Sequence, residues 1–183
     1  MRKVALQMGV SVDGYVSGGP NRTLDPGRRG EHPGVVAWKL DRLAEAGVHI
    51  MGRVAYEQMA AHWPNSTEAY AAPMNDLPKV VFSRTLTTTD WPTTRIADGD
   101  LTDEISRLKE EPGGDIVVHG GALFVQALSQ RSLIDEYRLV TYPAALGSGQ
   151  PMFKNLDSVL DLELVEASPF DDGTVITVYR PRR

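Results

Sequence analysis

Residues 115–121 of the chain read Asp115-Ile116-Val117-Val118-His119-Gly120-Gly121. The branched apolar run at 116–118 predicts a short strand that is buried on both faces. The two glycines interrupt this strand, and residues 122–128 then follow the pattern of a helix. A buried strand that passes through a glycine turn into a helix is typical of a parallel α/β sheet.

The same order of strand, break and helix recurs along the chain. We expect strands over residues 4–10, 48–51, 79–82, 93–97, 115–118 and 136–142, and helices over 35–46, 53–61, 101–110 and 122–128. Residues 162–167 and 174–179 alternate in polarity around Asp171-Asp172-Gly173, which predicts an antiparallel hairpin. The predicted fold is a single three-layer α/β domain over residues 1–183, with a mainly parallel sheet and this hairpin at its edge.

Glycine and proline give three further expectations. Gly47 follows the predicted helix 35–46, at the position of a C-cap. Residues 62–78 contain three prolines, so we expect irregular structure there. Residues 17–34 are rich in glycine and proline, which predicts a long surface loop that could close over a binding site.

The composition excludes several classes of protein. With 42% apolar and 23% charged residues, the 183-residue chain is neither disordered, fibrous nor membrane-spanning. Its net charge of −5 disfavours nucleic acid as a partner. The absence of cysteine excludes disulfides, thiolate metal sites and a cysteine nucleophile, and the four histidines have no metal-ligand spacing. No signal-peptide pattern opens the sequence, so we expect a cytoplasmic protein.

Small or basic residues follow three of the predicted strands, as Met51-Gly52-Arg53, Phe82-Ser83-Arg84 and Val118-His119-Gly120-Gly121. In a parallel sheet these strand ends share the carboxyl edge, where ligands bind. Glycine admits a ligand close to the backbone, a helix N-terminus attracts phosphate, and arginine pairs with phosphate oxygens. We interpret the three ends as a dinucleotide site because the pattern recurs at all three, although each alone is better explained by a tight turn or a surface charge.

The order of the motifs resembles the dihydrofolate reductase-like superfamily, and in particular the reductase domain of the bifunctional riboflavin-biosynthesis deaminase-reductase. The resemblance covers nearly the whole chain. It rests on Ser11-Val12-Asp13-Gly14-Tyr15, Met51-Gly52-Arg53-Val54-Ala55-Tyr56-Glu57, Val81-Phe82-Ser83-Arg84-Thr85-Leu86, Asp115 to Gly121, Leu133-Ile134-Asp135-Glu136-Tyr137 and Leu146-Gly147-Ser148-Gly149. The dinucleotide fingerprint G-x-G-x-x-G is absent after the first strand, which disfavours an ordinary Rossmann fold.

The resemblance implies NADPH as the cofactor. The residues that match its cofactor-binding positions are Gly52, Arg53, Val54, Ser83, Arg84, Thr85, His119, Gly120, Gly121, Ala122, Leu123 and Phe124. Within this set, Arg53 and Ser83 with Arg84 match the positions that hold the adenosine 2′-phosphate and ribose in the superfamily, and Gly120 and Gly121 match the glycine pair that lies against the pyrophosphate there. The two arginines imply a preference for NADPH over NADH, because NADH lacks their anion.

The substrate face that the resemblance implies consists of Asp13, Tyr15, Trp38, Tyr56, Trp63 and Tyr142. Asp13 is the candidate catalytic residue, as a donor of the proton, and water is the other candidate donor. Purely structural roles are the alternatives for three residues of the predicted sites. Asp13 could instead shape a turn with Gly14, Trp38 could be a core residue, and His119 could be a hydrogen-bonded structural residue.

One departure from the folate reductases bears on the substrate. Those enzymes carry a carboxylate shortly before a segment like Ala37-Trp38, whereas the matching stretch here is Gly34-Val35-Val36. We therefore expect an NADPH-dependent reductase that transfers hydride to a C=N or C=O group of a small heterocyclic substrate. Dihydrofolate reduction and a non-catalytic nucleotide-binding role are the alternatives. We also expect a homodimer, with residues 136–142 and 174–179 as a candidate dimer face.

Overall fold

The computed structural model describes residues 1–18, 24 and 30–182. The strands are β1 (Val4–Ser11), β2 (Tyr15–Ser17), β3 (Ala46–Gly52), β4 (Lys79–Phe82), β5 (Thr94–Ile96), β6 (Asp115–Val118), β7 (Glu136–Tyr142), β8 (Gln150–Pro151), β9 (Leu162–Pro169) and β10 (Val175–Pro181). The helices are α1 (Pro33–Ala44), α2 (Arg53–His62), the 3-10 turn η2 (Trp63–Asn65), α3 (Ala71–Asp76), α4 (Leu101–Glu110) and α5 (Ala122–Gln130).

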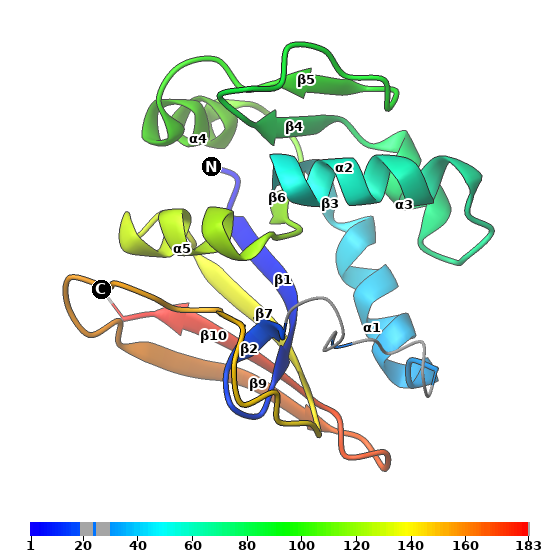
Figure 1. The fold of residues 1–183 in the computed structure, drawn as a ribbon, viewed down its shortest axis with the longest axis vertical. Helices are drawn as coiled ribbons and strands as arrows, with labels where there is room; N and C mark the ends of the chain where they lie inside the picture. Colours follow the sequence, from blue (N-terminus) through cyan, green and yellow to red (C-terminus); the bar gives the residue numbers. More distant parts are fainter. Residues whose placement is uncertain (19–23, 25–29, 183) are drawn as a thin grey trace.

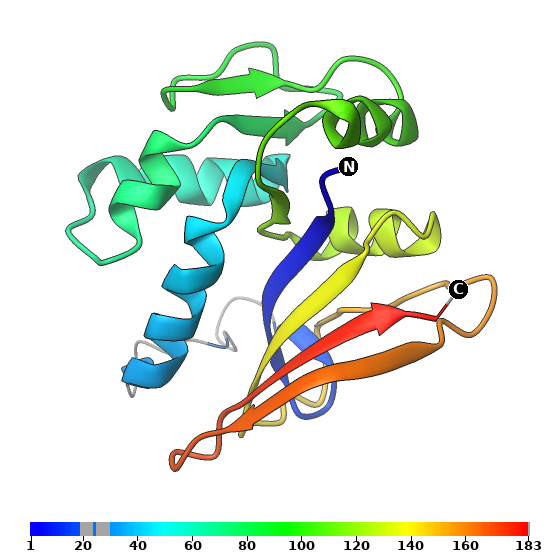
Figure 2. The same cartoon turned by 180° about the vertical axis from the view of Figure 1, so that it is seen from behind.

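Eight of these strands form one sheet in the order β5-β4-β3-β6-β1-β7-β10-β9. The strands from β5 to β7 run parallel, and β10 pairs antiparallel with both β7 and β9. β5 lies at one end of the sheet and the β9–β10 hairpin at the other (Figures 1 and 2). The predicted fold class is thereby confirmed. The short pair β2–β8 was not foreseen.

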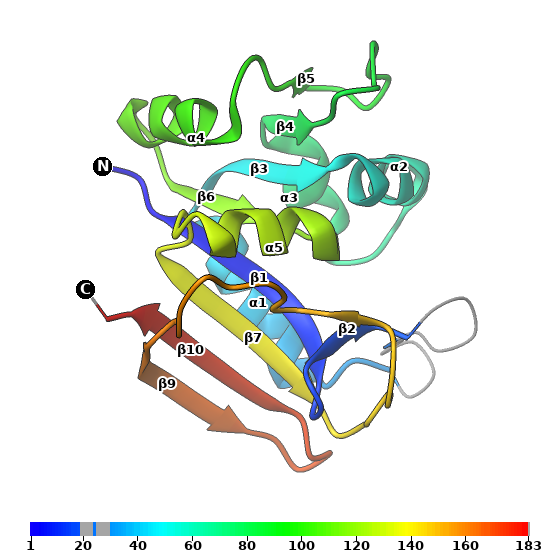
Figure 3. The same ribbon diagram turned by 60° about the vertical axis from the view of Figure 1, so that its left-hand side comes forward.

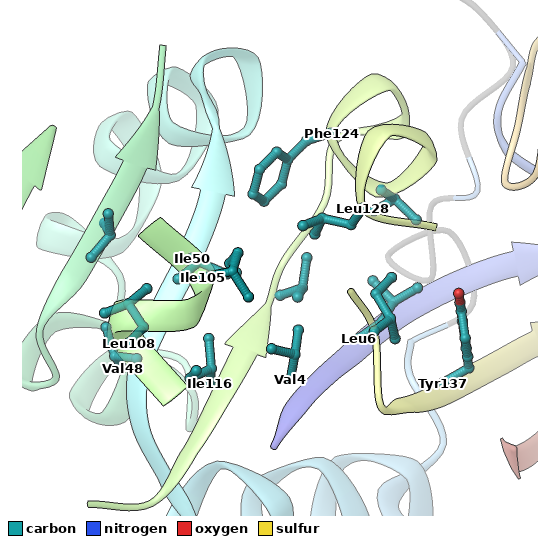
Figure 4. Close-up of a cluster of buried hydrophobic side chains, with 14 of the residues drawn as sticks. Val4, Leu6, Val48, Ile50, Ile105, Leu108, Ile116, Phe124, Leu128 and Tyr137 are labelled. Carbon is teal, nitrogen blue, oxygen red and sulfur yellow. The ribbon is translucent and has the colours of Figure 1, made fainter. Parts of the chain in front are cut away.

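Helices cover both faces of the sheet. Alternate strand residues point to opposite sides, so the apolar strands present side chains that must be buried on each face. One face packs against α4 and α5, and its buried side chains form the main core (Figure 4). Those drawn there include Val4, Leu6, Val48, Ile50, Ile116 and Tyr137 from the strands, and Ile105, Leu108, Phe124 and Leu128 from the helices. Helix α1 lies on the opposite face from α5 (Figure 3), where Val35 packs against Val140 and Ile176. The three layers follow from this arrangement.

Two local expectations were wrong. Gly47 belongs to β3 rather than to a helix C-cap, because α1 ends at Ala44 with Glu45 as its cap. A glycine is needed at 47 since a Cβ there would lie 2.7 Å from the backbone nitrogen of Gly114. Residues 62–78 are also more regular than expected. They contain η2 and α3, whose prolines lie in the first turn, where the missing N–H has no helical partner to lose.

The C-terminal hairpin turns where the sequence predicted it. Gly173 has a φ of +85°, and the Phe170 N–H donates to the Thr174 carbonyl. The candidate dimer face comprises β7 and β10, and each of these strands has a neighbour on both sides in the sheet. The edge strand on this side is β9, on which Leu164 is 53% exposed. Most of the loop predicted at 17–34 lies outside the described residues. Among the helices that the structure describes, none is long and apolar enough to span a bilayer.

Candidate cofactor and substrate site

Three turns meet at the carboxyl edge of the sheet, because β4, β3 and β6 are neighbours in register. Gly52 pairs with Phe82 across β3 and β4, and Ile50 pairs with Val118 across β3 and β6. The Gly52 N–H also donates to the Gly120 carbonyl at 3.3 Å. The structure therefore brings together the turns at 52–54, 83–85 and 119–124, as the sequence predicted.

Two of the glycines at this edge, Gly52 and Gly120, occupy places where a side chain would collide with its surroundings. A Cβ on Gly52 would lie 3.0 Å from Cβ of Phe124. Gly120 has a φ of +96°, and a Cβ there would lie 2.9 Å from Cε of Met8. Gly120 and Gly121 are joined by a cis peptide bond, and the space beside Gly121 is open. The backbone is thus accessible to a ligand at Gly121.

Two helices begin at this edge without a side-chain cap. Gly52 is the N-cap of α2 and Gly121 that of α5, and neither can offer a side-chain acceptor to the first N–H groups. Just inside each helix an apolar side chain is exposed, 56% for Val54 and 74% for Leu123. Free N–H donors beside exposed apolar surface suit a ligand that carries both phosphate and a ring.

The two arginines of the predicted site differ in their partners. Arg53 forms an ion pair of 2.8 Å with Glu57, one turn along α2. Arg84 is exposed and forms no ion pair or hydrogen bond with any described residue. The Ser83 hydroxyl accepts from the Thr85 and Leu86 N–H groups at 3.2 and 2.9 Å, which fixes the turn that carries Arg84. Arg84 is thus the cation at this edge that is free for an anion.

A cavity of about 490 Å³ adjoins the edge. Its walls come from β1, α1, α2, α3 and the ends of β6 and β7. The lining residues are Gln7, Met8, Gly9, Val16, Leu24, Glu31, Lys39, Leu43, Met59, Trp63, Glu68, Tyr70, Met74, His119 and Tyr142. His119 belongs to this lining and directly precedes the glycine pair, so the glycine edge and the cavity meet at His119.

Glu31 is the centre of a polar cluster in the cavity. Its Oε1 accepts from Tyr142 at 2.9 Å and from Lys39, and its Oε2 accepts from Tyr70 at 2.6 Å. Burial alone would raise the pKa of Glu31, but the Lys39 charge and the three hydrogen bonds outweigh it, and the pKa is lowered. Burial and the Glu31 carboxylate raise the pKa of both tyrosines. The cluster therefore holds an ionised carboxylate and two neutral phenols.

Sequence reasoning missed Glu31. The comparison with folate reductases directs attention to residues 34–36 on the helix, which carry no acid. The carboxylate instead comes from the segment before α1, two residues ahead of Pro33. An acid just before a proline that opens a helix is the available signal, but only the fold shows that this residue reaches the cavity.

The residues predicted for the substrate face fall in two groups. Trp63 and Tyr142 line the cavity. Trp38 instead donates from Nε1 to Glu166 at 2.8 Å, and the buried Tyr56 hydroxyl donates to Asp90 at 2.8 Å. Tyr15 lies in β2, paired with Pro151. The structure does not bring these three side chains to the cavity wall.

Asp13 lies at the surface and is held by hydrogen bonds. Its carboxylate accepts from the Ser11 hydroxyl at 2.6 Å and from the N–H groups of Leu146 and Gly147 at 3.0 and 2.7 Å. These bonds lower the pKa of Asp13 to about 2. An acid with this pKa is ionised at neutral pH, so the geometry favours the turn-forming role over proton donation.

The described residues hold no group of three or more histidine, aspartate and glutamate side chains that could bind a metal ion.

Together, the sheet order and the cavity at its carboxyl edge define a protein of the dihydrofolate reductase-like fold. A model of the RibD C-terminal domain family matches residues 2–176, and the chain belongs to that family. Two curated relatives from Bacillus subtilis (strain 168), both described as uncharacterized, match along almost their whole length. YyaP is 28% identical and covers 97% of this chain and 94% of its own length. YwjB is 29% identical and covers 98% of each.

Solved structures agree on the fold. A candidate riboflavin biosynthesis protein from Shewanella sp. PV-4 aligns over 100% of both chains with a TM-score of 0.82 and 22% identity. The deaminase/5-amino-6-(5-phosphoribosylamino)uracil reductase of Thermotoga maritima aligns over 99% of this chain and 57% of its own, with a TM-score of 0.69 and 14% identity. Dihydrofolate reductase from Enterococcus faecalis, complexed with NADP(H), covers 99% and 97%, with a TM-score of 0.65 and 13% identity.

Proposed function

We propose that the protein is an NADPH-dependent oxidoreductase that reduces a C=N or C=O group of a heterocyclic substrate, of the ribosylaminopyrimidine type named for the Thermotoga maritima relative. The observation that carries the proposal is the junction at His119, where the glycine edge opens onto the cavity. A dinucleotide on the edge and a ring in the cavity would be neighbours, which direct transfer between them requires.

The edge fits NADPH on its own geometry. The open backbone at Gly121 and the uncapped starts of α2 and α5 suit a pyrophosphate. Arg84 is free to meet the 2′-phosphate, with Arg53 on the neighbouring turn. When bound, NADPH supplies the hydride.

The chain's own residues position the substrate and limit the water around it. Apolar side chains of the cavity, among them Met59, Trp63 and Met74, provide a surface for a flat ring. The Glu31 cluster supplies fixed polar groups that orient the ring. Because Asp13 is ionised and occupied in its turn, water is the favoured source of the proton in this proposal.

Binding experiments with the two reduced nucleotides test the cofactor. Titration of the protein, followed by nucleotide fluorescence, should give tighter binding of NADPH than of NADH. Arg84→Ala should weaken NADPH binding roughly tenfold or more, the loss of one hydrogen bond to a charged group, and leave NADH unchanged. Arg131→Ala, at the opposite end of α5, is the matched control. Equal affinity for the two nucleotides in the wild type would refute the 2′-phosphate assignment.

Turnover tests the reaction. Oxidation of bound NADPH on addition of a ribosylaminopyrimidine supports the reductase. Tight NADPH binding with no oxidation by any aminopyrimidine or pterin would replace it with the non-catalytic nucleotide-binding role.

Dihydrofolate reduction remains a second candidate because the cavity does contain a carboxylate. Glu31 has about one acceptor position left beside its three donors, since a carboxylate offers roughly four. That position could receive an N–H group of a pterin. Measurable turnover of dihydrofolate, lost in Glu31→Gln, would favour this candidate.

A further inference from the structure

Two histidine rings that take no part in the hydrogen bonds of the Glu31 cluster lie side by side, one in β3 and one just after β6. His49 is in β3 and pairs in register with Val117 of β6. His119 comes two residues after Val117, just beyond the end of β6, where its N–H still donates to the Ile50 carbonyl. Side chains two residues apart on a strand point to the same face. His49 and His119 therefore lie on one face of the sheet, with ring centroids 4.6 Å apart and edge to face. His49 is fully buried, whereas His119 lines the cavity.

The hydrogen bonds of this pair fix where the protons are. Nε2 of His49 lies 3.0 Å from the carbonyl oxygen of Pro73, which can only accept, so this nitrogen carries a hydrogen. Burial lowers the pKa of His49 to about 4, and its ring is neutral at pH 7 with a single N–H. Nδ1 of His49 is then an acceptor.

The position of the proton on the His119 ring follows from that on His49. Nε2 of His119 lies 2.8 Å from Nδ1 of His49, and it must donate because Nδ1 accepts. Burial is the main cause that lowers the pKa of His119 well below its usual value, so this ring is neutral too. The ring nitrogen left for a ligand is Nδ1, without a hydrogen and with no partner among the described residues.

We infer that His49 is a positioning residue that holds His119 in its Nε2–H form, so that Nδ1 of His119 accepts a hydrogen bond from an N–H donor of the ligand in the cavity. The ligand class that fits is a heterocycle with an exocyclic amino group. A second acceptor lines the same cavity, since Oε1 of Gln7 is buried and has no partner among the residues that the structure describes. The proton arrangement stands by itself, and the choice of ligand rests on the proposed function.

Nitrogen NMR of the unmodified protein tests the proton arrangement directly. Long-range proton–nitrogen correlation spectra distinguish the protonated from the bare ring nitrogen of a neutral histidine. We expect both His49 and His119 to show the Nε2–H form at neutral pH. An Nδ1–H form of His119, or a cationic ring, would overturn the inference without any variant being made.

A matched pair of substitutions separates positioning from simple structural support. His49→Asn keeps an acceptor near the position of Nδ1 and loses the donor to Pro73. His49→Gln keeps a donor near the position of Nε2 and loses the acceptor toward His119. We expect His119 to remain in the Nε2–H form in the asparagine variant and to become a mixture of forms in the glutamine variant. The same spectrum in both variants would assign His49 a structural role only.

Small probes test the ligand. Addition of 2-aminopyrimidine should move the Nδ1 resonance of His119, while pyrimidine, which lacks the amino donor, should leave it in place. An unmoved resonance with 2-aminopyrimidine, or equal shifts with both probes, would refute the acceptor role. NADPH titration of the same sample reports on the proposed function separately. If NADPH does not bind but the Nδ1 resonance of His119 still moves with 2-aminopyrimidine, the NADPH-dependent reductase proposal is refuted and the present inference stands.

Discussion

The hydroxyl of Tyr142 donates to Oε1 of Glu31 at 2.9 Å, although 111 positions separate the two residues in the chain. This bond connects the end of β7 to the segment before α1, and Lys39 and Tyr70 complete the cluster around the carboxylate. It shows how the cavity is assembled from parts of the chain that share no local motif.

Replacement of Glu31 tests the strength of this cluster. Glu31→Gln leaves the Lys39 ammonium without its counter-ion in a place where its side chain is only 18% exposed. We expect a loss of about 3 kcal/mol in the free energy of unfolding, the usual cost of breaking a buried pair, measured by urea denaturation. Tyr142→Phe removes one hydrogen bond and should cost about 1 kcal/mol.

Glu68→Gln is the matched control, because Glu68 lines the same cavity but pairs with His62 at the surface. Its change in unfolding free energy should stay within about 0.5 kcal/mol. An equal loss in the Glu68 and Glu31 variants would show that the cluster contributes no special stability.

The glycine pair offers a second test. Gly120→Ala places a side chain at positive φ against Met8, and we expect a loss of about 1 to 3 kcal/mol in stability. Gly121→Ala has open space for its methyl group. It should lower the free energy of unfolding by only about 0.5 kcal/mol, because alanine is a poorer N-cap than glycine at the start of α5. That methyl group nevertheless occupies the proposed pyrophosphate surface, so NADPH affinity should fall. Wild-type affinity in this variant would place the pyrophosphate elsewhere.

Asp13 should act on the turn at 146–147 rather than on the chemistry. Asp13→Asn weakens the bonds to the Leu146 and Gly147 N–H groups, and we expect both amides to exchange hydrogen faster in the variant. Asp41→Asn, on the exposed side of α1, serves as the control. Unchanged exchange at both amides would contradict the turn-forming role.

Acid should destabilise the protein through Glu136. Burial acts to raise its pKa, but hydrogen bonds and charge from Arg138, with Arg180 and Lys3, lower it from 4.5 to about 2. A lowered folded-state pKa means that the stabilisation is present above about pH 4.5 and is lost as the pH falls toward 2. Urea unfolding across this window should show the decline, amounting to about 3 kcal/mol.

Glu136→Gln should flatten that decline, whereas Glu110→Gln, on the exposed end of α4, should leave it unchanged. A pH dependence of unfolding that is identical in the wild type and the Glu136 variant would assign the acid sensitivity to other carboxylates.

The sequence by itself determined the order of the strands of the main sheet and of the longer helices, because apolar periodicity and glycine breaks are local signals. It missed the short elements β2, β8, η2 and α3. It also determined that the turns at Gly52, Arg84 and Gly120 belong together, since parallel strands place their carboxyl ends at one edge. The errors of the prediction from sequence also concerned local structure. Gly47 could not be distinguished from a helix cap without knowing that Gly114 lies against it.

Only the tertiary structure decided which polar side chains are buried and which of them reach the cavity. Lys79 opens a strand that the sequence predicts as apolar, yet its ammonium is buried and donates to the carbonyl of Leu77 at 2.7 Å. Glu31 meets Tyr142, and His49 meets His119, across distances in sequence that no spacing rule covers. The physical reason is that a polar group becomes stable in the interior only when its partners arrive with it, and the partners are supplied by packing.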